Sequence, residues 1–300
     1  MRISAVVNTY NEERNIMRCL TSIRPHVDEI VVVDMNSTDR TVSKARQITD
    51  KVYKHPYTGY VEPARNFALT KAKNDWVLLL DADEELPQSL GIQIRRLVEK
   101  EYSFYRIPRK NLVFNKWLHH SGWWPDYQIR LFKKDAVSWS DEIHSIPITE
   151  GKGSDLLAEE ANALIHYNYQ TIEQFIERMN RYTSIEAQAK HTAGKQFSWK
   201  NLFSLPTNEF LNRYFAWEGY KDGLHGLILS IFQAISFLIV ETKLWQIEQF
   251  YEPDEEWLQA IETEKNKVNN DINHWFQVKK NEKLQGPIKK IYSLKSKFRL

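Results

Sequence analysis

Short apolar runs alternate with segments of helical periodicity over the first hundred residues of the chain. The runs are rich in valine, isoleucine and leucine, which is typical of strands buried on both faces. Between them, apolar residues recur every three or four positions, as in amphipathic helices packed on a sheet. Such strand–helix alternation predicts parallel α/β units. We predict strands over residues 3–7, 30–33, 52–53 and 76–80, and helices over residues 16–23, 41–48 and 64–72.

The pattern changes after about residue 103. Aromatic-rich runs with alternating polarity predict strands over residues 104–108 and 127–132. A helical pattern follows over residues 172–190, and a second helical region begins after Pro206. The chain therefore divides into an α/β part and a helical C-terminal part.

Residues 224–240 form the most apolar segment of that helical part. A helix of this length falls short of the ~20 residues that a membrane span requires. Gly226, Ser230 and Gln233 make a narrow polar stripe at helical spacing. Three alternatives follow: a helix buried in the fold, a helix lying in a membrane interface, or a true span.

The composition excludes intrinsic disorder, because 42% of the 300 residues are hydrophobic and 27% are charged. Cys19 is the only cysteine, which excludes an intrachain disulfide and a zinc site built on several thiolates, and fits a reducing compartment. The N-terminal run reaches Asn8 too early for the apolar core of a secretory signal. We therefore expect a cytoplasmic protein, either free or bound at the inner face of a membrane.

The net charge of +2 hides a basic C-terminal end. Residues 279–300 hold eight basic residues and one acidic residue, so the rest of the chain is net negative. Such a segment is attracted to an anionic membrane surface or to nucleic acid, or is simply solvated. The sequence has no nucleic-acid-reading motif, so we expect no nucleic-acid partner.

Three polar loops follow predicted strands, at residues 8–12, 34–39 and 81–85. The carboxyl ends of parallel strands meet at one edge of a sheet, which is where ligands of α/β proteins bind. Asp81 and Asp83 are two residues apart at a strand end, so both carboxylates can face one crevice and hold Mg²⁺ or Mn²⁺. The alternative is that they cap the following helix. Neither the dinucleotide-binding pattern GxGxxG nor the P-loop pattern GxxxxGK[ST] is present, so neither explains these polar loops.

The loops and strands together carry a resemblance. Residues 6–12 (VVNTYNE), 29–41 (EIVVVDMNSTDRT), 65–66 (RN) and 76–84 (WVLLLDADE) resemble the successive blocks of glycosyltransferase family 2. This family consists of nucleotide-sugar enzymes with the GT-A fold, an α/β fold with a mostly parallel sheet. Later segments around residues 123–132, 143–144 and 166–183 resemble the subgroup that includes lipopolysaccharide-core glucosyltransferases.

The resemblance implies a domain plan. Residues 1–100 would be the nucleotide-sugar-binding half of the GT-A domain, and residues 101–205 its acceptor-side half. Residues 206–300 would be a helical region, either free or membrane-associated, that ends in the basic segment 279–300.

The resemblance also implies roles for the donor-site residues. The loop that holds base and ribose would contain Asn8, Thr9, Tyr10, Glu12 and Asp34. Arg65 would approach the donor diphosphate, Asp81 the ribose or a metal-bound water, and Asp83 the metal itself. Many family members carry a second acid after the position of Asp34, where this chain has Met35, so the base is left open.

Two further residues keep alternative roles. His166 would complete the metal shell, as a late histidine does in several GT-A enzymes, or would be a hydrogen-bonded core residue. Arg130 would face the donor diphosphate or form a structural ion pair.

Inverting transfer, which the resemblance implies, needs a base that takes the proton of the acceptor hydroxyl. Glu142 is the first candidate, followed by Asp141 and Asp126. We therefore expect a metal-dependent inverting glycosyltransferase that acts on a cell-envelope glycolipid or lipopolysaccharide core. The alternative is a non-catalytic scaffold, built on a degenerate transferase domain, that binds sugar or lipid.

Overall fold

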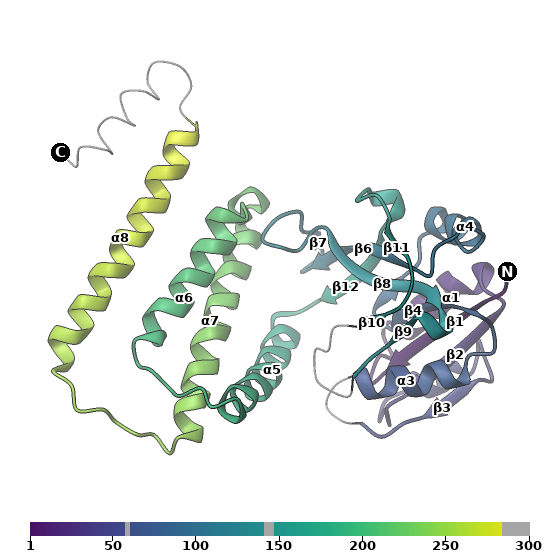
Figure 1. Ribbon diagram of the computed structural model, residues 1–300, viewed down its shortest axis with the longest axis horizontal. Helices are drawn as coiled ribbons and strands as arrows, with labels where there is room; N and C mark the ends of the chain where they lie inside the picture. Colours follow the sequence, from purple (N-terminus) through teal and green to yellow (C-terminus); the bar gives the residue numbers. More distant parts are fainter. Residues whose placement is uncertain (58–60, 141–146, 284–300) are drawn as a thin grey trace. The chain divides into compact units, whose positions relative to one another are not determined.

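The computed structural model describes residues 1–57, 61–140 and 147–283. The chain forms two compact units (Figure 1). The first contains Met1–Trp117 and Trp123–Gln170, and the second contains Leu118–Gly122 together with the chain from Thr171 onward. The α/β part of the sequence and its helical part are thus separate bodies, and each is described by itself.

The first unit is built on parallel strands with helical crossovers. Strand β1 lies between β2 and β4, and β3 pairs with the outer side of β2. The elements are β1 (Ile3–Thr9), α1 (Ile16–Ile23), η1 (Arg24–His26), β2 (Glu29–Asp34), α2 (Thr41–Ala45), β3 (Val52–Lys54), α3 (Glu62–Lys71) and β4 (Trp76–Asp81). After β1 the chain continues to β2 on one side of the sheet, and after β4 it continues to the strands on the other side. The carboxyl ends of β1 and β4 therefore border a crevice.

The sheet continues beyond β4 with antiparallel pairs. Within the described residues it has ten strands, and its main path runs β3-β2-β1-β4-β8-β6-β12-β5, with β7 and β11 pairing with β6. The added elements are β5 (Glu84–Glu85), α4 (Gln88–Leu97), β6 (Phe104–Val113), β7 (Lys116–Trp117), β8 (Asp126–Lys133), η2 (Lys134–Ala136), β11 (Gly153–Asp155), η3 (Glu160–Asn162) and β12 (Leu164–Tyr169). Strands β9 (Val137–Ser138) and β10 (Ile148–Thr149) form a separate antiparallel pair. The predicted α/β class is confirmed, with a mixed sheet.

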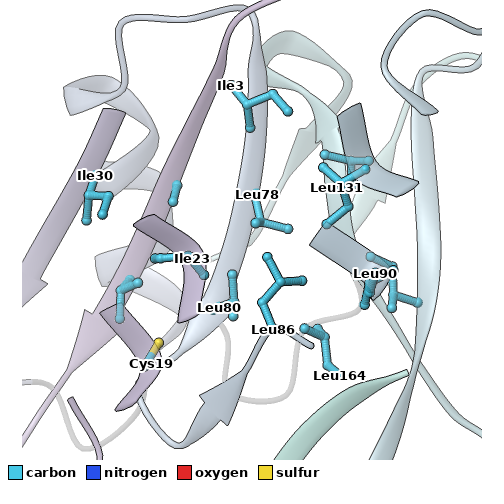
Figure 2. Close-up of a cluster of buried hydrophobic side chains, with 14 of the residues drawn as sticks. Ile3, Cys19, Ile23, Ile30, Leu78, Leu80, Leu86, Leu90, Leu131 and Leu164 are labelled. Carbon is cyan, nitrogen blue, oxygen red and sulfur yellow. The ribbon is translucent and has the colours of Figure 1, made fainter. Parts of the chain in front are cut away.

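Side chains alternate between the two faces of the sheet, and each face has its own core. On one face, residues such as Ile3, Leu78 and Leu80 pack with Cys19 and Ile23 of α1 (Figure 2). The opposite core is built by Val6, Val31 and Leu79 with residues of α3, among them Ala64 and Ala68. The continuous apolar runs fit this arrangement, because every position of β1 and every position of β4 except Asp81 is buried.

The second unit is helical. It consists of α5 (Ile172–Thr192), α6 (Asn201–Leu211), the π-helical turn η4 (Asn212–Ala216), η5 (Gly219–Asp222), α7 (Leu224–Ile247) and α8 (Trp257–Lys283). The side chain of Thr171 caps α5 by accepting the Gln174 N–H at 3.2 Å. A Cβ on Gly226 would lie 1.8 Å from the carbonyl oxygen of Gly219, so only glycine allows α7 to pack this closely.

Several predicted helix bounds differ from the structure. Helix α6 begins at Asn201 and contains Pro206, whereas we predicted that the helical region begins after Pro206. Helix α2 ends at Ala45, where we predicted a helix to residue 48. Helix α7 runs for 24 residues to Ile247, so the expectation that it is too short to span a membrane does not hold. Among the described residues α7 is long and apolar enough for a span by length and composition, with a mean hydropathy of 1.8.

The polar stripe of α7 faces inward. Ser230 is fully buried and its hydroxyl donates to the Gly226 carbonyl at 2.7 Å. Leu224, Ile231 and Ile235 are exposed on the same helix, at 67%, 40% and 37%. Gly226 and Ser230 thus allow close helix packing in the second unit, beside buried apolar residues such as Leu229 and Leu244, whereas other apolar side chains of α7 are exposed.

Candidate functional site

The loops after β1 and β2 are bound to each other at the carboxyl edge of the sheet. The backbone N–H of Asn11 donates to Ser37 Oγ at 2.8 Å, and Thr38 N–H donates to Asn11 Oδ1 at 2.8 Å. Asn8 at the end of β1 stands opposite Asp81 of β4 in the strand register. The polar ends predicted from the sequence therefore lie at one edge, as expected of parallel strands.

Several buried polar atoms at this edge have no hydrogen-bond partner among the described residues. They are Oδ1 and Nδ2 of Asn8, Oγ1 of Thr9 and Oδ1 of Asp34. Asn8, Thr9 and Asp34 are 4%, 2% and 1% exposed. A buried polar group without a partner costs about 1–3 kcal/mol, so such a group points to a ligand or an ordered water.

Tyr10 and Glu12 complete the predicted donor loop. The Tyr10 ring stacks on Tyr57, with ring centroids 4.0 Å apart and an interplanar angle of 10°. Glu12 faces α1, where its Oε2 accepts from Asn15 Nδ2 at 2.7 Å. Tyr10 therefore lies in a stacked aromatic pair, and the Glu12 side chain is hydrogen-bonded to the residue that precedes α1.

Asp81, the last residue of β4, is held by two arginines. Arg65 on α3 donates from Nη2 to Oδ1 at 3.2 Å, and Arg130 on β8 donates to Oδ2. Glu84 joins them, since its Oε2 accepts the Asp81 backbone N–H at 3.0 Å and its Oε1 accepts Arg130 at 2.7 Å. Arg109 on β6 reaches the same Oε1 at 3.3 Å. The strand end is fixed by a largely buried ionic cluster.

These charges set the protonation of the cluster. Burial raises the pKa of Asp81, but the positive charges of Arg130 and Arg65 outweigh it and hold that pKa far below its ordinary value. Burial lowers the pKa of Arg130, and the carboxylates of Asp81 and Glu84 more than reverse this. Asp81 is therefore ionised and Arg130 charged at physiological pH. The Asp81 side chain stays 25% exposed, so one edge of it remains accessible.

Arg130 lies between two carboxylates. Its side chain is 2% exposed and pairs with Asp81 and Glu84, so it forms ion pairs within the protein. Arg65 is 15% exposed and its Nε is buried with no partner in the described part of the chain. The Nε of Arg130 is also buried without a partner in that part of the chain, so what distinguishes Arg65 is its greater exposure.

Asp83 and His166 face each other beside this cluster. Nε2 of His166 on β12 lies 3.4 Å from Oδ2 of Asp83, and both residues are buried. Nδ1 of His166 lies 2.6 Å from Oδ1 of Asn111 on β6. The backbone N–H of Tyr167 donates to the Asp83 carbonyl at 2.9 Å, which fixes Asp83 against β12.

The residues present fit a divalent cation only in part. Within residues 1–57, 61–140 and 147–283, no three His, Cys, Asp or Glu side chains lie close enough to hold a metal ion by themselves. An imidazole nitrogen and a carboxylate oxygen are nevertheless acceptable ligands for Mn²⁺, and a nucleoside diphosphate supplies further oxygens. The pair Asp83 and His166 suits a metal that is bound together with its substrate.

Asp126, one of the candidate bases, is fully engaged by donors. Its Oδ2 accepts from Arg109 Nε at 2.9 Å and from Asn111 Nδ2 at 3.1 Å, and its Oδ1 accepts from Gln128 at 2.9 Å. Burial raises the pKa of Asp126, but Arg109 and the hydrogen bonds hold it below its ordinary value. A carboxylate held in this way is a weak proton acceptor. Asp141 and Glu142 lie outside the described residues.

Sequence reasoning missed Glu84, Arg109 and Asn111. Glu84 directly follows the Asp81–Asp83 pair, so its position was a usable signal. Arg109 and Asn111 are two residues apart on β6 and therefore share a face. Polar residues that share a face of a central strand are a signal that we did not use.

The second unit has a cavity of about 470 Å³. Four aromatic side chains and two lysines line it, namely Tyr214, Phe215, Tyr220, Phe276, Lys279 and Lys280. The Lys279 ammonium lies 5.8 Å from the Tyr220 ring centroid. This lining combines aromatic walls with positive charge.

Buried, unpaired polar groups at the carboxyl ends of parallel strands are typical of a ligand-binding α/β domain. The family model described as glycosyl transferase family 2 matches residues 4–149. An uncharacterized glycosyltransferase of Rickettsia typhi is 32% identical over 258 residues, which cover 82% of this chain and 87% of that protein. The chain belongs to glycosyltransferase family 2 and is a glycosyltransferase, as the sequence motifs predicted.

One further relative and one solved structure were also found. The lipopolysaccharide core biosynthesis glycosyltransferase LpsC of Rhizobium meliloti is 25% identical over 258 residues, covering 81% of this chain and 92% of LpsC. Among solved structures, S. aureus TarS 1-349 in complex with UDP-GlcNAc is 16% identical, with a TM-score of 0.45, and the match covers 85% of this chain and 93% of that chain. The mixed sheet flanked by helices is the GT-A arrangement expected of the family.

Proposed function

We propose that this glycosyltransferase moves a sugar, with inversion, from a nucleoside-diphosphate sugar to a hydroxyl group of a cell-envelope glycolipid or lipopolysaccharide core. A divalent cation, Mn²⁺ or Mg²⁺, assists the transfer. The observation that carries the proposal is the pair formed by Asp83 and His166, whose carboxylate and imidazole lie 3.4 Å apart beside the crevice at the end of β4.

The donor nucleotide would satisfy the polar atoms left without partners at this edge. Asn8, Thr9 and Asp34 offer a donor–acceptor amide, a hydroxyl and a carboxylate oxygen, which suit a base and a ribose. Tyr10 offers a flat aromatic face. Met35 is buried in the core and brings no carboxylate, so the base is not assigned.

Asp83 and His166 would hold the cation, and the donor diphosphate would complete its ligand shell. When bound, the cation supplies a Lewis acid that neutralises negative charge on the leaving diphosphate. Arg65 adds a fixed positive charge with an unused Nε donor on the same side. Asp81 holds Arg65 in place through the 3.2 Å ion pair and presents its exposed edge to the ribose.

Glu142 would take the proton of the acceptor hydroxyl, with Asp141 as the second candidate. Asp126 is disfavoured, because Arg109 and the hydrogen bonds on its carboxylate lower its pKa.

An anionic glycolipid acceptor is supported by three observations. LpsC, a 25% identical relative, is described as a lipopolysaccharide core biosynthesis glycosyltransferase. The second unit has exposed apolar side chains on α7 and a cavity lined by aromatic residues and lysines. Residues 279–300 add a basic segment. The apolar surface of α7 and this basic segment are two weak membrane anchors, and stable peripheral binding requires two. We therefore propose that the enzyme works at the inner face of a membrane.

The proposal is tested by thermal shift with UDP, GDP, ADP and dTDP, each with Mn²⁺ or with EDTA. One diphosphate should raise the apparent stability, by about 2.7 kcal/mol when its concentration is about 100 times Kd. Asp83→Ala should remove the Mn²⁺-dependent part, whereas Asp155→Ala, in an exposed ion pair of β11, should not. Equal stabilisation in Mn²⁺ and EDTA would contradict the role of the metal. Hydrolysis of the donor sugar without acceptor, with and without EDTA, gives an independent readout.

A further inference from the structure

Asn111 links three groups of the site through one amide. Its Nδ2 donates to the Trp123 carbonyl at 2.8 Å and to Asp126 Oδ2 at 3.1 Å, and its Oδ1 lies 2.6 Å from His166 Nδ1. Asn111 is 1% exposed, so water does not compete for these bonds. Its side chain therefore has one orientation that satisfies its neighbours.

That orientation follows from the chemistry of the partners. A backbone carbonyl and an ionised carboxylate only accept hydrogen bonds, so the NH₂ group of Asn111 must face Trp123 and Asp126. Arg109 keeps Asp126 ionised, because its charge and hydrogen bonds hold the pKa of that carboxyl below its ordinary value. The carbonyl oxygen of Asn111 is then left for His166.

The orientation of the amide determines the tautomer of the histidine. Since Asn111 Oδ1 can only accept, Nδ1 of His166 must carry the hydrogen. In the neutral ring Nε2 is then unprotonated, and its lone pair points toward Asp83 Oδ2 at 3.4 Å. The Nε2 lone pair and the Asp83 carboxylate can together coordinate a cation. In metal-binding histidines the other ring nitrogen donates a hydrogen bond that fixes the tautomer, as Nδ1 does to Asn111 here.

We infer that Asn111 is a positioning residue that fixes the Nδ1–H tautomer of His166 and thereby presents Nε2 to a divalent cation shared with Asp83. This inference rests on the metal site of the proposed function. It also gives Asp126 a role, since Asp126 orients the Asn111 amide and Arg109 orients Asp126.

The test reads the tautomer directly. Long-range ¹H–¹⁵N correlation spectra of the metal-free, full-length protein at about pH 8.5, some two units above the ordinary histidine pKa, report which ring nitrogen is protonated. The His166 signals are assigned by their loss in His166→Gln. The wild type should show Nδ1–H alone, and Asn111→Leu should show a mixture of tautomers.

Mn²⁺ binding in the presence of the nucleoside diphosphate that stabilises the protein, followed by electron paramagnetic resonance, gives the second readout. Asn111→Leu should weaken Mn²⁺ binding by about 10- to 100-fold, as expected for loss of a residue that orients a ligand. Asn66→Leu is the control, because it loses two hydrogen bonds to the Trp139 backbone in the same unit without touching His166. It should keep the tautomer and the affinity.

Two results would overturn the inference: a pure Nδ1–H tautomer in Asn111→Leu, or Mn²⁺ affinity unchanged within about twofold in that variant. If the wild type shows the Nδ1–H tautomer, and the variant the mixture, but neither binds Mn²⁺, the metal site of the proposed function fails. The positioning of His166 by Asn111 is then still supported.

Discussion

Arg130 and Glu84 form an ion pair in which Nη2 and Oε1 are 2.7 Å apart and neither side chain is more than 2% exposed. Glu84 also accepts the backbone N–H of Asp81, so the pair fixes the end of β4. Breaking a buried ion pair on one side leaves the other charge without compensation, which costs far more than losing a surface pair.

Arg130→Met should therefore lower the free energy of unfolding by about 3–5 kcal/mol. The methionine approximates the volume of the arginine stem, so the loss measures the charge left behind on Glu84 and Asp81 and not a cavity. Denaturant unfolding followed by circular dichroism provides the measurement. Arg106→Met, in the exposed pair with Asp155, is the matched control and should cost no more than about 1 kcal/mol. Similar losses in both variants would show that the cluster does not stabilise the strand end.

The sequence predicted the edge of the sheet but not this cluster. Strands β1, β2 and β4 were predictable because their apolar runs demand burial on both faces. The arginines that pair with Glu84 were not, because Arg130 and Arg109 lie on β8 and β6, which are brought near β4 only by long-range antiparallel pairing. The same pairing makes Arg130 a buried partner of Asp81, which alternation along one strand could not reveal.

Asn8→Ala should separate stability from donor binding. Both amide atoms of Asn8 are buried without partners among the described residues, so their removal should leave the unfolding free energy unchanged or slightly higher. Affinity for the stabilising nucleoside diphosphate should fall about tenfold, equivalent to about 1.4 kcal/mol. Calorimetric titration and denaturant unfolding measure the two quantities.

Asn15→Ala is the control for this prediction. Asn15 is as buried as Asn8, at 4% exposure, but its amide is hydrogen-bonded to Glu12 and Arg18. Its loss should cost about 1–3 kcal/mol. If Asn8→Ala destabilises the protein as much as Asn15→Ala does, the Asn8 amide serves the fold and not a ligand.

Asp81 should make the stability dependent on acid pH. Its pKa is lowered in the folded state, so ionised Asp81 stabilises the fold fully above the unfolded pKa of about 3.9. That contribution is lost as the pH falls below this value toward the lower folded pKa. Asp81→Asn should thus be less stable than the wild type at pH 7 and at pH 5, with the gap narrowing only below about pH 4. Unfolding curves over this range test the sign, and a gap that closes above pH 5 would contradict it.

The order of candidate bases can be tested with isosteric amides. Glu142→Gln should lower the rate of sugar transfer by about 10²- to 10⁴-fold, because an amide cannot take the acceptor proton. Binding of the nucleoside diphosphate should stay unchanged, since the base acts on the acceptor. Asp141→Asn should have a smaller effect on the rate. A larger loss in Asp141→Asn would exchange the two roles.

Membrane binding should depend on both the basic segment and helix α7. Replacing Lys289, Lys290, Lys295 and Lys297 by glutamine removes four charges, each of which contributes about 1 kcal/mol near an anionic surface. Flotation with vesicles containing phosphatidylglycerol should therefore fall sharply, and added salt should weaken wild-type flotation in the same way.

The apolar contribution is tested separately with Ile231→Ser and Ile235→Ser, which alter exposed side chains of α7. Ile92→Ser, an equally exposed isoleucine on α4 in the first unit, is the control. The α7 variants should reduce flotation even at high salt, because burial of apolar area in the bilayer is not screened by ions. If the lysine variant and the α7 variants float like the wild type, the enzyme does not use these surfaces to reach a lipid acceptor.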